Sequence, residues 1–234
     1  MELVYIITFS PSFLILGYIY FSDRYKEPIL LVLSTFLLGH ILCIPAGILN
    51  GYFIFSSNTP EKLSFIAGLV EEPLKFSVLY FFIRKRKMFD EPMDAIVYGV
   101  LISLGFATLE NIEYVFLSNQ EIPSIIIAFI RAFTAIPLHA CCGIIMGYYF
   151  GLYYFRPEKS NLIKSLIVPT GIHCLYNYLT NANTLYFALF LIAVIIFAAK
   201  LHRKVKNEQK GKLFEAENRP VSYTHLTLPT TPYV

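Results

Sequence analysis

Long apolar runs constrain this chain more than any other feature of its sequence. Each run is close to the roughly 20 residues that a helix needs to cross a bilayer. The chain is 56% hydrophobic and only 15% charged, whereas a soluble domain carries more charge and fewer unbroken apolar stretches. The mean hydropathy of +0.58 agrees, so the sequence predicts an all-α, polytopic transmembrane helix bundle. We expect about seven spans, at residues 3–21, 29–52, 62–83, 93–117, 122–152, 162–180 and 184–200.

The basic residues indicate the orientation of this bundle. Seven spans place all the basic segments on one side, which the positive-inside rule makes cytoplasmic. We therefore expect the N-terminus outside and the C-terminus in the cytoplasm. The net charge of +3 is accounted for by this topology, so we expect no nucleic-acid partner. The basic segments are residues 24–26, 84–87, 156–164 and 200–212, and almost no basic residue lies at 53–61, 118–121 or 181–183.

The ends of the chain set the expected domain limits. Apolar sequence begins at Leu3 without a basic n-region or a cleavage site, which favours a first span over a signal peptide. We expect residues 1–200 to form the membrane domain and 201–234 a cytoplasmic tail. Within that tail, residues 219–234 are rich in Thr and Pro, and we interpret them as non-native or disordered. The four cysteines lie in apolar runs without CxxC spacing, so they predict neither a disulfide framework nor a zinc knuckle.

Five carboxyl and imidazole side chains inside the apolar runs are of the types that activate water. An ionisable group near the middle of a bilayer costs roughly 3 kcal/mol on insertion scales, so each needs a compensating partner. A single buried His or Glu is most simply explained by a structural hydrogen bond. Five such groups on four runs instead favour one shared polar site. They are Glu71, Glu72, Glu110, His139 and His173.

Neighbouring residues extend this predicted site. Lys75 is four residues after Glu71 and shares its helical face, which permits an internal ion pair. Asn111 follows Glu110, and Asn commonly makes hydrogen bonds between membrane helices. Asn177 shares a face with His173. Helix-breaking residues lie close to most of these groups, and irregular backbone at membrane depth is tolerated where it lines a water-filled cavity. These residues are Pro73, Gly105, Pro137 and Gly171.

Such a pocket suits hydrolysis by either of two routes. A buried Glu can accept a proton from water, while a His or Asn donates to the oxyanion that forms on a carbonyl. Alternatively, Glu110, His139 and His173 hold zinc and another Glu acts as the base. Residue types alone do not choose between these routes.

The motifs resemble those of a known family. The segments EEPLK at 71–75, GFATLENIEY at 105–114, the isolated His139 and HCLYN at 173–177 are similar to the PrsW family of bacterial intramembrane proteases. The resemblance runs from about residue 11 to residue 200. It extends more distantly to the CAAX-prenyl-protease and bacteriocin-processing group. Asn177 departs from the pattern, because family members often carry Asp there, and no task is assigned to Pro73.

The resemblance implies an activity, a substrate and a location. It implies a multi-pass protease of the bacterial cytoplasmic membrane, with residues 1–200 as its protease domain. The substrate would be an anti-sigma factor with one membrane span, cut at site 1 so that an extracytoplasmic-function sigma factor is activated in a stress response. The implied site consists of Glu71, Glu72, Glu110, His139, His173 and Asn177, supported by Lys75 and Asn111.

Two other classes of protein explain the same residues. An ion-coupled transporter also uses carboxylates at the midplane and broken helices, although the sequence shows no internal repeat. A non-catalytic membrane scaffold, or a haem protein with His139 and His173 as axial ligands, is the third interpretation. Neither histidine lies in a haem-attachment motif.

Overall fold

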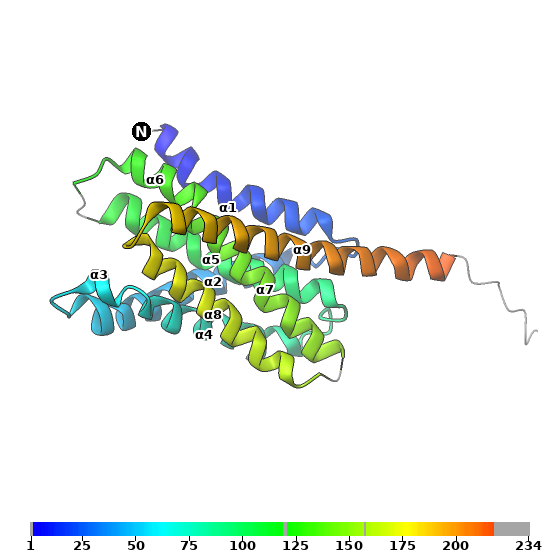
Figure 1. Cartoon of the computed structure of the whole chain (residues 1–234). Helices are drawn as coiled ribbons and strands as arrows, with labels where there is room; N and C mark the ends of the chain where they lie inside the picture. The colour runs from blue at the N-terminus through cyan, green and yellow to red at the C-terminus, as the bar shows by residue number, and fades with distance from the viewer. Residues whose placement is uncertain (1, 119–120, 157, 218–234) are drawn as a thin grey trace, which may run out of the picture.

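The computed structural model describes residues 2–118, 121–156 and 158–217, and these residues form a bundle of helices without β-strands (Figure 1). The predicted all-α membrane bundle is therefore confirmed. Within the described residues, five helical segments are long and apolar enough to cross a membrane. They are Glu2–Ser22, Ile29–Phe55, Pro92–Leu117, Ser124–Phe155 and Thr184–Gly211.

Helices α5 (Pro92–Ile112) and α7 (Ala135–Phe155) form the centre of the bundle. Over an apolar stretch of 18 residues in the segment that contains α5, 83% of the residues are buried inside the protein. The corresponding fraction is only 17% for the segments of α1 (Glu2–Ser22) and α9 (Thr184–Glu217). These outer helices expose large apolar side chains such as Leu14 and Ile192. Such surfaces suit contact with lipid acyl chains rather than water.

Glycines allow the two central helices to approach closely. A Cβ atom added to Gly143 would lie 2.6 Å from the carbonyl oxygen of Gly99, and one added to Gly147 would lie 2.2 Å from that of Ala95. Both distances are shorter than van der Waals contact with backbone atoms that cannot move away. Small residues at such crossings let membrane helices pack by direct backbone contact.

Helices α4 (Ile66–Phe81) and α8 (Ser160–Thr180) pack against each other beside this centre, and α2 (Ile29–Asn50) covers α4 and α5. Neither α4 nor α8 is among the five apolar segments. Helix α4 has 16 residues and includes Glu71, Glu72 and Lys75, which lower its hydropathy. The seven-span topology and the orientation of the termini remain predictions.

Two of the predicted spans are interrupted. The expected span 122–152 divides at Thr134 into α6 (Ser124–Phe133) and α7. The expected span 62–83 contains part of α3 (Pro60–Leu63), then α4 and the short turn η2 (Ile83–Lys85). Helices α2 and α5 end in π-helical turns, η1 (Gly51–Phe55) and η3 (Glu113–Leu117).

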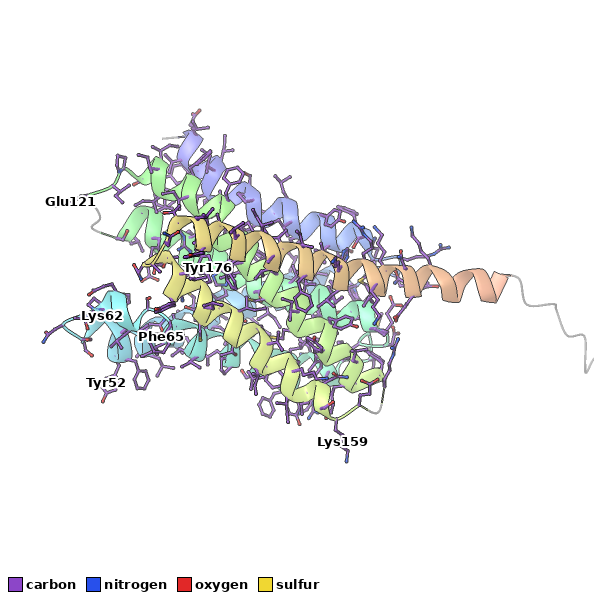
Figure 2. The ribbon with its side chains drawn as sticks, viewed as in Figure 1. Tyr52, Lys62, Phe65, Glu121, Lys159 and Tyr176 are labelled. Atoms are coloured by element: carbon purple, nitrogen blue, oxygen red, sulfur yellow. The ribbon has the colours of Figure 1, made fainter. Side chains whose placement is uncertain are left out.

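The two ends of the bundle differ in character. Figure 2 shows Tyr52, Lys62 and Glu121 at one end and Lys159 at the other. Helix α9 continues unbroken past residue 200 as far as Glu217 and extends beyond the bundle at the end that Lys159 marks in Figure 2 (Figures 1 and 2). Val205 and Gln209 are buried on this continuation, so its first turns pack against the bundle. Residues 219–234 lie outside the described residues.

Candidate active site

A cavity of about 560 Å³ lies between α2, α4, α5, α7 and α8. Its walls at the bundle end that includes Tyr52 are formed by Phe55, Pro60, Ser118 and Asn181. Of the sequence-predicted site residues, five line the cavity: Glu71, Glu110, His139, His173 and Asn177. Glu72, Lys75 and Asn111 are fully buried and lie behind this wall. The structure thus brings groups from four separate helices to one chamber.

A close crossing of α4 and α8 positions the two adjacent carboxylates. A Cβ atom added to Gly68 would lie 2.6 Å from the backbone nitrogen of Cys174, so the glycine permits direct backbone contact. This contact brings Glu72, one helical turn after Gly68, against His173. Glu71 points about 100° away around the helix and reaches the cavity, where Asn50 donates a hydrogen bond of 3.3 Å to its Oε1.

The Lys75 ammonium is the cation at the centre of this cluster. Its Nζ lies 2.8 Å from Glu72 Oε1, 3.5 Å from Glu71 Oε2 and 3.0 Å from His139 Nδ1. It also lies 4.2 Å from the centre of the Phe106 ring, a cation–π distance. The sequence predicted the Glu71–Lys75 pair, but the shorter contact is with Glu72. One ammonium therefore compensates two carboxylates inside the membrane.

These contacts fix the protonation of His139. An ammonium group only donates hydrogen bonds, so His139 Nδ1 accepts from Lys75. The ring is then neutral, with its proton on Nε2, and this N–H donates to Glu110 Oε2 over 3.0 Å. Both nitrogens of His139 are engaged, which holds the ring as a bridge between Lys75 and Glu110.

His173 has one nitrogen engaged and one directed at the cavity. Its Nδ1 donates to Glu72 Oε1 over 2.9 Å, an arrangement that orients the ring. Its Nε2 lies 3.9 Å from Glu71 Oε2. This separation is too long for a good direct hydrogen bond but suits a water that contacts both atoms. The Asn177 side chain, one turn further along α8, lines the same cavity and makes no hydrogen bond to any described residue.

Arg131 is a site residue that the sequence analysis missed. Its guanidinium donates to Glu110 Oε2 over 2.7 Å and to Asn111 Oδ1 over 2.6 Å, and it lies 4.2 Å from the centre of the Tyr114 ring. Asn111 in turn donates to the Thr8 carbonyl of α1. Like the five ionisable groups selected from the sequence, Arg131 is an ionisable residue inside an apolar run, here 122–152, so the same criterion applies to it.

The cluster includes residue types that bind metal ions. Glu71, Glu72, His139 and His173 each offer a ligand atom, and these atoms lie within 4.8 Å of one another. The second oxygen of Glu72 is buried without a hydrogen-bond partner. Imidazole and carboxylate ligands suit zinc. However, while Lys75 is charged both nitrogens of His139 are engaged, so a metal would need Lys75 to move aside. Glu110, predicted as a ligand with the two histidines, is outside this compact group.

Comparison with known proteins identifies the family of this chain. The model of a family described as PrsW family intramembrane metalloprotease matches residues 27–200. The chain belongs to the PrsW family. It is therefore a membrane-embedded protease, as the motifs implied.

Curated relatives agree with this PrsW assignment over nearly their whole length. The chain is 37% identical to Protease PrsW of Geobacillus kaustophilus, over 86% of this chain and 90% of the relative. It is 34% identical to Protease PrsW of Bacillus subtilis, over 85% and 93% of the two chains. With Protease PrsW of Clostridioides difficile it shares 28% identity over 90% and 94%. No solved structure matches the chain.

Proposed function

We propose that this PrsW protein hydrolyses a peptide bond of a single-span membrane protein, with Glu71 as the general base. The observation that carries this proposal is the pair of Glu71 Oε2 and His173 Nε2, which face one cavity 3.9 Å apart. A water between them donates one hydrogen bond to each atom. It is then held beside a carboxylate that can take its proton.

The reaction follows from these positions. Glu71 accepts a proton from the water, and the water oxygen forms a bond to the carbonyl carbon of the substrate. The resulting oxyanion accepts hydrogen bonds from Asn177 and Arg131, which lie on the cavity wall. Glu71 then returns its proton to the leaving nitrogen as the carbon–nitrogen bond breaks. Glu72 does not touch substrate, because it is buried behind the wall and fixes Lys75 and His173.

The location of the cavity supports a substrate class. Its outer wall is formed by segments that hold almost no basic residue and that the positive-inside rule places outside the cytoplasm. A first cut near that face of the bacterial cytoplasmic membrane fits site-1 cleavage of an anti-sigma factor. We therefore propose such a factor as the substrate and activation of an extracytoplasmic-function sigma factor as the result.

A zinc-dependent route is the second candidate, favoured by the compact ligand group and the unpartnered Glu72 oxygen. Glu71, Glu72, His173 and, after release from Lys75, His139 would hold the ion, which would supply a Lewis acid for the attacking water. Metal analysis of the purified protein separates the routes. The Glu71–water route predicts no stoichiometric zinc and full cleavage after chelation, whereas zinc at one ion per chain would favour the second.

Cleavage of a tagged single-span anti-sigma factor tests the function itself. Co-expression with the parent should give a new fragment, and Glu71→Gln should lower its rate by about 100-fold or more because the general base is lost. Glu208→Gln makes the same chemical change in an exposed ion pair with Arg156 and should leave cleavage unaltered. Equal cleavage by the parent and Glu71→Gln, with both proteins equally abundant, would refute Glu71 as the base.

A further inference from the structure

A second cavity of about 460 Å³ lies between α1, α7 and α9 and shares no lining residue with the active-site cavity. Most of its wall is apolar. Ile15 and Ile19 come from α1, Ile144 comes from α7, and Ile195 and Ala198 come from α9. Ile19, Ile144 and Ala198 form the buried floor of this cavity. Ile195 and Ala199 are exposed on the outer helix α9, so the cavity can be reached from the lipid-facing surface.

The end of the second cavity nearer the C-terminus of α9 is cationic. Arg203, Lys206 and Lys210 line it, spaced along α9 at intervals of three and four residues and therefore on one helical face. No carboxylate lines the cavity, and none of the three cations forms an ion pair with a described residue. The nearby Glu208 is instead paired with Arg156 at 2.7 Å. His202 also lines the cavity, but its Nε2 is hydrogen-bonded to Ser22 Oγ at 2.7 Å.

The spacing of the lining residues along α9 suits one acyl chain of a lipid. Ile195 and Lys206 are eleven residues apart, which at 1.5 Å per residue is about 16 Å along α9. Half of the hydrocarbon thickness of a bilayer is about 15 Å. An acyl chain beside Ile195 thus has its headgroup near Lys206. Cations at this level of a membrane helix attract anionic headgroups, and basic pockets between helices bind them.

We propose that this cavity binds an anionic phospholipid, with an acyl chain along Ile15, Ile144 and Ile195 and the phosphate at Arg203, Lys206 and Lys210. The apolar wall and the three cations, of which Lys206 lies 6.0 Å from the centre of the Tyr18 ring, together select this occupant. A zwitterionic lipid brings no net negative charge to the three cations, and a soluble phosphate leaves the apolar wall uncovered. The site is independent of the proposed function, since it contains none of the catalytic groups.

Native mass spectrometry of the full-length protein in detergent tests the proposal. Phosphatidylglycerol should bind the parent about 10-fold or more tightly than phosphatidylcholine with the same acyl chains. The variant Arg203→Gln/Lys206→Gln/Lys210→Gln should bind the two lipids equally. The variant Lys85→Gln/Arg86→Gln/Lys87→Gln removes three exposed charges elsewhere and should keep the preference. If the parent binds both lipids equally, the three cations do not select the headgroup. The same conclusion follows if the two triple variants lose the preference for phosphatidylglycerol to the same extent.

A second pair of variants tests the apolar part. Ala199 lines the cavity on an exposed position of α9, so Ala199→Trp should fill the groove and release phosphatidylglycerol. Ala193 is exposed on the same helix outside the cavity, so Ala193→Trp should bind like the parent. Unchanged binding of phosphatidylglycerol by Ala199→Trp would show that the lipid does not occupy this cavity. Glycerol phosphate, which has the headgroup charge without acyl chains, should not compete, and efficient competition would make the occupant a soluble phosphate.

Discussion

In the proposed mechanism Glu72 supports the site from behind the cavity wall, without touching substrate. Its side chain is fully buried, and it accepts hydrogen bonds from both Lys75 and His173. Removal of one partner from a buried ion pair leaves an uncompensated charge, which typically costs about 3–5 kcal/mol. Its contribution should therefore be visible in stability, separately from activity.

Glu72→Gln should lower the thermal unfolding temperature of the protein in detergent, because Lys75 loses its closest carboxylate. The double variant Glu72→Gln/Lys75→Gln removes both charges and should recover part of that loss, but not all of it, because Glu71 also loses its ammonium partner. Cleavage should stay low because His139 is no longer held by an ammonium. Differential scanning fluorimetry and the cleavage assay measure the two effects. A double variant as unstable as the single one would show that the charge pair is not the cause.

Arg131 should act through geometry as well as charge. Its planar guanidinium contacts Glu110 and Asn111 at once, and lysine cannot reproduce such a fork. Arg131→Gln should reduce the cleavage rate by about 100-fold, the typical cost of one lost oxyanion donor, and Arg131→Lys should retain an intermediate rate. Arg156→Gln removes an exposed arginine and is the matched control. Parent-like cleavage by Arg131→Gln would remove this residue from the oxyanion site.

The sequence could predict which ionisable groups need partners, but not which of them face the cavity. An ionisable residue in an apolar run signals burial, and five such residues were found in this way. Glu71 and Glu72 are adjacent, and the rotation of α4 that exposes only Glu71 depends on the Gly68–Cys174 contact between distant segments. Arg131 signals burial in the same way, but its position beside Glu110 depends on the break at Thr134, which hydropathy does not predict.

Among the elements, the break between α6 and α7 has a local cause. Pro137 has no backbone N–H and cannot bond to the carbonyl of Phe133, the last residue of α6. The first bond of the new helix runs from the Leu138 N–H to the Thr134 carbonyl over 3.1 Å. Hydropathy predicts that this run is helical and membrane-embedded, but it contains no information about the direction of the chain after such a break.

The close crossing of α5 and α7 predicts that a single added methyl group destabilises the protein. Gly147→Ala would place a Cβ atom 2.2 Å from the Ala95 carbonyl oxygen, so the helices must separate. Overpacking of this kind typically costs about 1–3 kcal/mol, and the unfolding temperature should fall. Gly17→Ala in α1 meets nothing within 4 Å and should leave stability equal or higher, by up to about 1 kcal/mol of helix propensity. Equal unfolding temperatures for both variants would contradict direct backbone packing.

At the scale of the whole molecule, a polar network joins three distant segments at the Lys159 end. Gln209 on α9 donates to Asp23 Oδ1 over 2.8 Å and to Glu91 Oε1 over 2.5 Å. Tyr98 donates to Glu27 in the same region, and Asp94 caps the start of α5 through the backbone N–H groups of residues 90 and 91. This network attaches the extension of α9 beyond residue 200 to the bundle.

The network should make stability depend on pH. Burial, with a further contribution from the charge of Asp23, raises the pKa of Glu91 to about 7, and burial also raises the pKa of Glu27. A carboxyl with a raised pKa in the folded state binds its proton more tightly there than in the unfolded chain. Its contribution to stability is therefore present at acidic pH and is lost as pH rises from about 4.5 through about 7.

The unfolding temperature of the parent in detergent should accordingly fall between pH 5 and pH 8, and Glu91→Gln should flatten this dependence. Glutamine keeps the oxygen that accepts from Gln209 but cannot ionise, so the variant should gain most, relative to the parent, at pH 8. Glu208→Gln removes a carboxylate of the same helix end outside the network and should follow the parent curve. The network is not what responds to pH if the unfolding temperature of the parent rises between pH 5 and pH 8. The same conclusion follows if Glu91→Gln leaves the pH dependence of the unfolding temperature unchanged.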